Sequence, residues 1–305
     1  MPKLLTRASF KLFTILDRGG VHVLPKHYYT PVPDYDWLNR NKQVWTRRTS
    51  LTGVRWNLDE QLEWLAQTCV PYYHEVRGLE FYEQTVASGV GAGFGAIESQ
   101  VLHCFIRSKA PRRIVEIGSG VSTACIVNAA KQNSRAGKSW PSIVCIEPYP
   151  RKAFGTITNI RHLKEPCQTV SASTFDELQG GDLLSVDSSH SLRVGSDVLR
   201  IYLDIIPRLA PGVFIHIHDI FLPYLYQRSV LFKYFAWQET SLLTALLVNN
   251  THLSILACLS ALHYDRTEKT VELFSDYKPR KGSAGLDESS QPTGDFPASL
   301  WLRTC

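Results

Sequence analysis

The sequence predicts an α/β fold whose mostly parallel, doubly wound sheet is covered by helices on both faces. Two observations carry this prediction. From about residue 96 onward, short apolar runs with strand character alternate with segments of helical periodicity. A glycine turn joins the first of these strands, RIVEIG, to the helix VSTACIVNAAKQN. Crossovers between parallel strands are right-handed, so successive units build one sheet.

The elements follow in order along the chain. Strands are expected, from apolar runs bounded by turn residues, at 113–118, 142–150, 167–173, 182–190, 212–220, 252–262 and 299–303. Helices are expected, from apolar residues spaced three and four apart, at 95–111, 121–133, 151–160, 195–209 and 226–250. The stretch 279–297 is rich in Gly, Pro and Ser and is expected to be a mobile loop.

Residues 1–80 are expected to form an N-terminal extension that packs on a main domain of residues 81–305. The extension begins with a basic amphipathic helix, continues as a Pro- and aromatic-rich segment at 22–38, and ends with a helix within 57–76. The apolar face of the first helix suits packing on the chain's own domain or on a second subunit, in a homodimer or with a different partner. Binding to a membrane surface is the less favoured interpretation.

Composition argues against several classes of function. The net charge of +5 is spread along the 305 residues, with no basic arm of the kind that binds nucleic acid. No uninterrupted apolar run approaches the ~18 residues that a membrane span needs. Seven single cysteines without a C-x-x-C pair argue against a disulfide framework and indicate a reducing, cytoplasmic setting.

The glycine turn indicates the kind of ligand. Ligands of doubly wound sheets bind beyond the carboxyl ends of the strands, so Gly118 and Gly120 lie where a ligand can approach the backbone. A dinucleotide fingerprint needs a third glycine, but that position is Thr123. Glu116 suits a cationic amino group, and Glu147, at the end of the second strand, suits ribose hydroxyls. This pair favours S-adenosylmethionine (SAM); a tight turn without a ligand is the alternative.

Several motifs together resemble a bacterial subgroup of the class I SAM-dependent methyltransferases. They are VEIGSGVST, IEPYP, VDSSH, HIHDIFLPY, HYYTPVPD and the terminal SLWLR, and they span nearly the whole chain. The resemblance implies a Rossmann-like sheet of about seven strands whose last strand is antiparallel. It also implies that Glu116, Gly118, Ser119 and Gly120 hold the methionine part of SAM and Glu147 the ribose, with the adenine near Ala172 and Ser173. We assign Asp187, at the end of the fourth strand, to the same cofactor site.

Polar side chains follow the fourth and fifth strands at one edge of the sheet. Asp187 and His190 follow the fourth strand, and His218 and Asp219 end the fifth. Methyl transfer needs an aligned nucleophile and often a base, and imidazole titrates in the right range. We therefore expect His190, His218 and Asp219 to position or deprotonate the acceptor. The alternatives are a structural rim of hydrogen bonds and a divalent metal, preferably a transition metal, held by Asp187, His190, His218 and Asp219.

Two further features have open interpretations. The aromatic segment with Tyr28, Tyr29, Tyr72, Tyr73 and His74 either forms a lid or wall of the substrate site or anchors the extension by ring packing. Glu239, on the predicted long helix, is expected to be exposed, with a position facing the pocket as the alternative.

Together, these observations predict a SAM-dependent methyltransferase that acts on a small molecule, such as an intermediate in natural-product or sugar biosynthesis. The favoured interpretation requires no metal. Two alternatives stay open, because the chain departs from the subgroup at Val121, 225–227 and 238–240, where substrate would bind. The first is a methyltransferase-like scaffold used for an elimination or a cyclisation. The second is a non-catalytic partner subunit that docks through the N-terminal extension.

Overall fold

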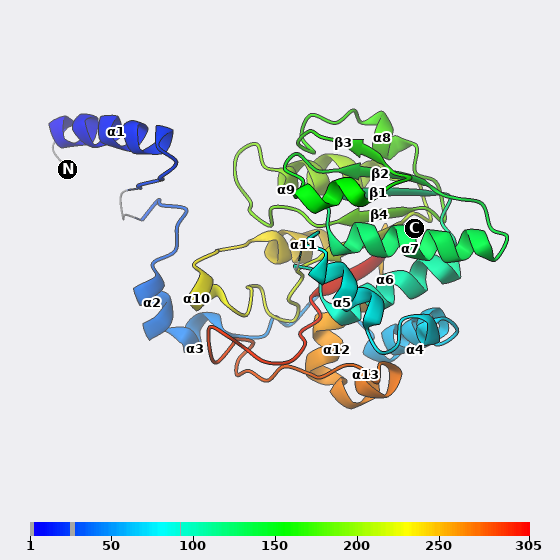
Figure 1. Ribbon diagram of the computed structural model, residues 1–305. Helices are drawn as coiled ribbons and strands as arrows, with labels where there is room; N and C mark the ends of the chain where they lie inside the picture. Colours follow the sequence, from blue (N-terminus) through cyan, green and yellow to red (C-terminus); the bar gives the residue numbers. More distant parts are fainter. Residues whose placement is uncertain (1–2, 25–27, 92) are drawn as a thin grey trace. The chain divides into compact units, whose positions relative to one another are not determined.

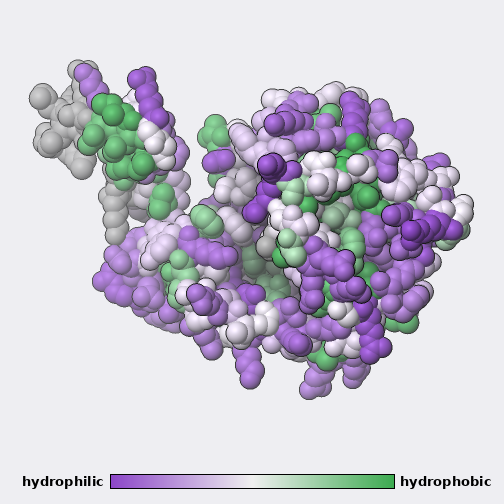
Figure 2. Space-filling model, in the orientation of Figure 1, coloured by the Kyte–Doolittle hydropathy of each residue, from purple (hydrophilic) through white to green (hydrophobic). Residues whose placement is uncertain are grey.

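The computed structural model describes residues 3–24, 28–91 and 93–305, and the chain divides into two compact units, 1–45 and 46–305. The first unit contains α1 (Lys3–Arg18), α2 (Tyr35–Arg40) and α3 (Lys42–Trp45). α1 confirms the predicted first helix, and Figure 2 shows apolar residues gathered on this helix. Leu12 and Ile15 of α1 are exposed. Residues 25–27, within the predicted Pro- and aromatic-rich segment, lie outside the described residues.

The predicted extension, residues 1–80, covers the first unit and the beginning of the second. In the second unit it includes α4 (Leu58–Cys69) and the short turn Tyr73–Glu75. Asn57 caps α4, because its side-chain oxygen accepts the N–H groups of Asp59 and Glu60 at 3.0 and 3.4 Å. The division of the chain at residue 80 stays a prediction.

A seven-stranded sheet forms the centre of the second unit (Figure 1), in the order β3-β2-β1-β4-β5-β7-β6. The strands are β1 (Arg113–Ile117), β2 (Ser142–Ile146), β3 (Arg161–Leu163), β4 (Leu183–Val186), β5 (Phe214–His218), β6 (Leu253–Cys258) and β7 (Ser299–Thr304). β1 to β5 are parallel, while β7 is antiparallel to both of its neighbours. This order confirms the doubly wound sheet and its antiparallel last strand.

Helices cover both faces of the sheet (Figure 1). One face packs against a layer formed by α4, α5 (Glu80–Ala87), α6 (Ala96–Lys109) and α7 (Val121–Arg135). The other packs against α9 (Asp197–Arg200), the helical turns Ile201–Arg208 that continue it, and α11 (Glu239–Leu247). Successive strand residues point to opposite faces, so Ile114 belongs to the first core and Val115 to the second.

The third strand lies earlier in the chain than predicted. Residues 167–173 form a turn that leads into α8 (Ser173–Asp176), and β3 precedes them. In this turn the Thr169 N–H bonds to the Pro166 carbonyl at 2.9 Å, and the Ser171 hydroxyl accepts the Ser173 N–H at 3.4 Å. Local bonds of this kind compete with a strand ladder. The helix predicted at 151–160 is also wrong in extent, since only the 3-10 turn Lys152–Thr156 forms.

Two other predicted elements are interrupted. The long helix expected at 226–250 is split into α10 (Val230–Lys233) and α11, because Tyr234 adopts a left-handed φ of 56° that ends α10. The strand expected at 252–262 ends at Cys258, and α12 (Leu259–Asp265) and α13 (Thr267–Leu273) follow it. The stretch 279–297 is irregular as predicted, but part of it is anchored by buried Arg228, whose Nε lies 2.9 Å from Asp287 Oδ1.

Most of the cysteines lie in the interior of the structure. All seven cysteines are free thiols, and six of them are buried, including Cys104, Cys125, Cys145 and Cys258 in the predicted core runs. Within the described ranges, no helix combines the length and apolar character that crossing a membrane requires.

Candidate active site

The turn between β1 and α7 requires glycine at position 118. Gly118 has a φ of +96°, and a Cβ at this position would lie 2.7 Å from the carbonyl oxygen of Asp187. Asp187 directly follows β4, and its N–H bonds to the Ile117 carbonyl at 2.8 Å. The glycine is therefore required by the close approach of two strand ends, at the edge of the sheet where ligands of this fold class bind.

Glu116 is buried beneath the turn, with only 1% of its surface exposed. Its two carboxylate oxygens accept the hydroxyl groups of Ser122 and Thr123, each at 2.6 Å. The Thr123 hydroxyl oxygen in turn accepts the Gly120 N–H at 3.1 Å. Thr123, which stands where a dinucleotide fingerprint has glycine, thus ties the first turn of α7 to β1. The predicted contact of Glu116 with the cofactor stays a prediction.

The stability of the fold is expected to fall with rising pH because of Glu116. Burial raises the pKa of this carboxyl from 4.5 to about 7, although the hydroxyl donors oppose that shift. A carboxyl with a raised folded-state pKa stabilises the fold at low pH, and this contribution is lost as the pH rises through 7. Between pH 5 and pH 8 we expect the wild type to lose about 2.5 kcal/mol relative to Glu116→Gln. Denaturant unfolding at both pH values measures this, and an identical pH dependence of the two proteins would contradict it.

Two predicted cofactor residues meet at the ends of β1 and β2. Ser119 follows β1 and Glu147 follows β2, and the Ser119 hydroxyl donates to Glu147 Oε2 at 3.3 Å. Glu147 Oε1 accepts the Tyr149 N–H at 2.7 Å, which holds the carboxylate at the sheet edge. Both residues are half-buried. Ala172, also half-buried, directly precedes α8, and its contact with an adenine stays a prediction.

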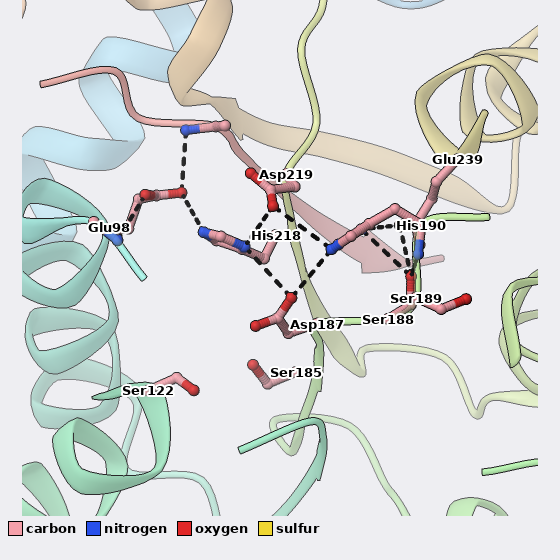
Figure 3. Close-up of polar contacts among 12 residues, drawn as sticks. Glu98, Ser122, Ser185, Asp187, Ser188, Ser189, His190, His218, Asp219 and Glu239 are labelled. Atoms are coloured by element: carbon pink, nitrogen blue, oxygen red, sulfur yellow. Dashed lines mark hydrogen bonds and ion pairs between the residues drawn. The ribbon is translucent and has the colours of Figure 1, made fainter. Parts of the chain in front are cut away.

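Two imidazoles share two carboxylates beyond β4 and β5 (Figure 3). His190 Nε2 lies 3.4 Å from Asp187 Oδ1 and 3.5 Å from Asp219 Oδ2. His218 Nδ1 lies 3.5 Å from each of the same two oxygen atoms. The structure therefore brings together all the residues predicted to serve the acceptor, because β4 and β5 are parallel neighbours that end at the same edge.

Two further carboxylates flank this cluster on its outer sides, and sequence reasoning missed their role. Glu239 Oε2 lies 2.6 Å from His190 Nδ1, and Glu98 Oε1 lies 3.3 Å from His218 Nε2. Glu239 is 1% exposed, so the expectation of an exposed acid is wrong. Glu98 is held by the N–H groups of Gly95 and Ala298, each at 3.1 Å. Glu98 is the third residue of the α6 sequence, a position from which a Glu side chain can accept the backbone N–H of the N-cap residue, and this helix-start signal could have singled it out.

The charges of the cluster follow from this arrangement. Burial lowers the pKa of His190, but the surrounding carboxylates, Asp187 first among them, outweigh burial and raise it to about 10. The pKa of His218 is raised well above its usual value for the same reason. Burial would raise the pKa of Asp187, but the two imidazoles outweigh burial and lower it. At Asp219 burial outweighs the imidazoles, so the pKa of this carboxyl is raised. Both imidazoles are therefore cations at neutral pH.

Backbone strain marks two of these residues. His190 and Asp219 both have a φ of 56°, in the left-handed region that residues other than glycine seldom adopt. Strain of this kind is typical of functional sites. His216, two residues before His218, lies in the core instead, where burial lowers its pKa to about 3 and its ring packs 4.6 Å from that of Trp301.

The alternative metal ligands Asp187, His190, His218 and Asp219 do come together, but as ion pairs between acids and imidazoles. Each imidazole has carboxylates at both of its nitrogen atoms. In the part of the chain that the structure describes, no three His, Cys, Asp or Glu side chains are arranged to hold a metal ion.

A cavity of about 420 Å³ lies beside the cluster, and its lining includes Glu98, His218 and Asp219. Aromatic side chains of Tyr82, Phe221, Trp237 and Phe296 form part of its wall. The Trp237 ring also packs 4.4 Å from the ring of His190. The broken helix explains this position, because Trp237 belongs to the loop between α10 and α11.

Tyr72 and Tyr73 of the second unit lie away from this cavity. Tyr73 donates its hydroxyl to Asp276 Oδ2 at 3.0 Å, and the guanidinium of Arg107 lies 5.0 Å from the Tyr72 ring. Neither Tyr72 nor Tyr73 lines the cavity, so these two residues pack rather than cover the site. Tyr28 and Tyr29 belong to the first unit, where their rings lie 5.2 Å apart and are exposed.

Comparison with known proteins identifies a domain within this sheet. Residues 115–220 match a family model described as a methyltransferase domain. A protein of Archaeoglobus fulgidus, described only as uncharacterized, is 28% identical over 166 residues, which cover 51% of this chain and 73% of that protein.

Solved structures with a similar arrangement include two methyltransferases. The Podospora anserina methyltransferase PaMTH1, bound to S-adenosylhomocysteine (SAH), superposes with a TM-score of 0.41 and 15% identity over 93% of this chain and 99% of that one. The Streptomyces achromogenes O-methyltransferase TomG, involved in tomaymycin synthesis and solved with SAM, has a TM-score of 0.45 and 14% identity over 80% and 98%.

Proposed function

We propose that this chain, whose residues 115–220 match a family model described as a methyltransferase domain, is a class I, SAM-dependent methyltransferase that methylates an oxygen atom of a small molecule held in the cavity beside His218 and Asp219. The position of that cavity carries the proposal. Its lining includes the last residue of β5 and the residue after it, at the edge of the sheet that also holds the glycine turn. An intermediate of natural-product or sugar biosynthesis is the acceptor class that we favour.

The residues at this edge fit SAM. Glu147 is a half-buried acid at the end of the second strand, where ribose hydroxyls are bound in this fold class. Asp187 lies directly beside the glycine turn, since a Cβ on Gly118 would lie 3.1 Å from the Asp187 Cβ. Gly118, Ser119, Gly120, Glu147 and Asp187 would hold the cofactor, with Ala172 near the adenine. When bound, SAM supplies an electrophilic methyl group.

Side chains of this chain would deprotonate the acceptor, stabilise its charge and position the carboxylates. Asp219 lines the cavity 3.5 Å from both imidazole rings, and burial raises the pKa of its carboxyl, which makes its carboxylate a stronger base for the proton of the acceptor hydroxyl. His218 also lines the cavity, and its positive charge stabilises the oxygen as it becomes negative. His190 does not line the cavity and acts as a positioning residue, because it holds Asp187 and Asp219 from the far side.

Calorimetry of the full chain against SAM and SAH tests the cofactor assignment. We expect both to bind with micromolar dissociation constants after treatment of the protein with a chelator, because the proposed site uses protein groups only. The absence of binding by a folded protein would overturn the proposal and favour a scaffold used for another reaction. Binding that returns only when a divalent metal is added would contradict the metal-free site.

A further inference from the structure

The start of α11 holds the loop that carries His190. The backbone N–H groups of Gln238 and Glu239 both donate to the His190 carbonyl, at 3.1 and 3.3 Å. The Gln238 side-chain oxygen accepts the Leu192 N–H at 3.1 Å. The ring of Trp237 packs with its centroid 4.4 Å from that of the His190 ring. The backbone of this loop is therefore fixed to α11 at two points, and the imidazole is covered on one face.

The Glu239 side chain adds a contact to the imidazole itself (Figure 3). Its Oε2 lies 2.6 Å from His190 Nδ1 and accepts the Ser188 hydroxyl at 2.7 Å. The Ser188 hydroxyl oxygen in turn accepts the His190 N–H at 2.9 Å. One carboxylate oxygen thus fixes the ring of His190 directly and its backbone through Ser188.

The burial of this carboxylate costs free energy. Glu239 is 1% exposed, and its other oxygen, Oε1, has no hydrogen-bond partner among the described residues. A buried carboxylate oxygen without a partner is unfavourable, and an apolar side chain would fill the same space without this cost. The carboxylate therefore indicates a role in the geometry of His190 rather than in packing.

His190 needs this support because its other contacts are long. Its Nε2 lies 3.4 Å from Asp187 Oδ1 and 3.5 Å from Asp219 Oδ2, which are distances beyond an ordinary hydrogen bond. Its backbone has a φ of 56°, which residues other than glycine seldom adopt. The short contact at Nδ1 therefore sets the direction in which Nε2 points.

Resting on the proposed function, we propose that Glu239 is a positioning residue that acts through His190. Its hydrogen bond to Nδ1 directs Nε2 toward both Asp187 and Asp219, and this keeps the Asp219 carboxylate in place beside the cavity. Glu239 does not line the cavity, so its effect on the acceptor passes through His190.

Proton NMR of the full chain tests the positioning directly. We expect a low-field imidazole N–H resonance that is protected from exchange with solvent and disappears in His190→Asn, where asparagine tolerates the left-handed backbone. Glu239→Leu should lose this resonance, whereas Glu239→Gln should keep it with a smaller low-field shift, because the amide oxygen still accepts the Nδ1 proton. Glu272→Leu, which changes an exposed glutamate on α13, is the control and should leave the resonance unchanged.

Transfer of a labelled methyl group from SAM, with catechol as the probe acceptor, tests the consequence. We expect Glu239→Leu to lower kcat about tenfold or more with KM for SAM unchanged, and Glu239→Gln to stay within about threefold of the wild type. In the His190→Asn background, Glu239→Leu should cause no further loss, because the two residues act as a unit. A merely structural role of Glu239 would make the two losses multiply.

The inference is overturned if the wild type shows no such resonance, if the resonance persists in Glu239→Leu, or if the two losses of kcat multiply in the double variant. Should Glu239→Leu not fold, loss of the resonance in Glu239→Gln would overturn it equally. A wild type that binds no SAH would overturn the proposed function. The imidazole resonance then decides this inference by itself, as it does if catechol is not methylated.

Discussion

Gly118→Ala is expected to weaken SAH binding by about 100-fold or more, equivalent to about 2.7 kcal/mol. An added Cβ would lie 2.7 Å from the Asp187 carbonyl oxygen and 3.1 Å from its Cβ, so the ends of β1 and β4 must move apart. That movement displaces Ser119 and Gly120 on one side and Asp187 on the other, all of which belong to the proposed cofactor site. Calorimetry with SAH measures the effect.

The matched control is Gly181→Ala. Gly181 has a φ of +95°, almost the same as the +96° of Gly118, but nothing lies within 4 Å of a Cβ built on it. Both variants therefore carry the same backbone strain, and only Gly118→Ala carries the clash. We expect Gly181→Ala to lose stability and to keep its affinity for SAH. Equal SAH affinity of the two folded variants would show that the turn does not form the cofactor site.

Asp219→Asn is expected to lower kcat by about 10²–10⁴-fold, the range that removal of a general base typically costs. Asparagine has the same shape as aspartate and also tolerates the left-handed φ of 56° at this position, so the backbone is kept. What is lost is the charge that faces His190 and His218 at 3.5 Å and that takes the acceptor's proton. Single-turnover transfer of a labelled methyl group from SAM measures this step apart from product release.

Two observations separate this chemical role from a structural one. Asp219→Asn should bind SAH within a few-fold of the wild type, and its remaining activity should rise with pH as the acceptor hydroxyl ionises without help. Asp204→Asn, on the surface beyond α9, is the control and should leave kcat unchanged. A kcat of Asp219→Asn close to that of the wild type would remove Asp219 from the proposed mechanism.

The local pattern was enough to predict most of the fold. β1, β4 and β5 are short apolar runs, buried on both faces, so their composition alone indicates strands of a parallel sheet. Local apolar pattern did not predict β3, the strand at one edge of the sheet. β3 has only three residues, none of them fully buried, and it exists because β2 offers a free ladder beside it. Its residues Arg161, His162 and Leu163 carry no strand signal that outweighs the apolar stretch following them.

The site could be predicted in its centre and not at its margins. Asp187, His190, His218 and Asp219 follow strands that the sequence identifies, and parallel strands end at a common edge, so their meeting follows from topology. Glu98 lies at the start of α6 and Glu239 at the start of α11, while Trp237 lies in the loop before α11. These segments are far from β4 in the sequence. No periodicity links them to the strand ends.

The amino-acid sequence by itself determined the alternation of strands and helices, the glycine turn with Glu116 and Glu147 near it, and the polar residues that follow β4 and β5. Each of these features depends on residues that are close together in the sequence. Only the tertiary structure decided that Tyr234 breaks the long helix, that Glu239 reaches His190 at 2.6 Å, and that His218 and Asp219 line a cavity. These features depend on which distant segments share a space and on how much water they exclude, and burial of this kind is a property of the packed chain.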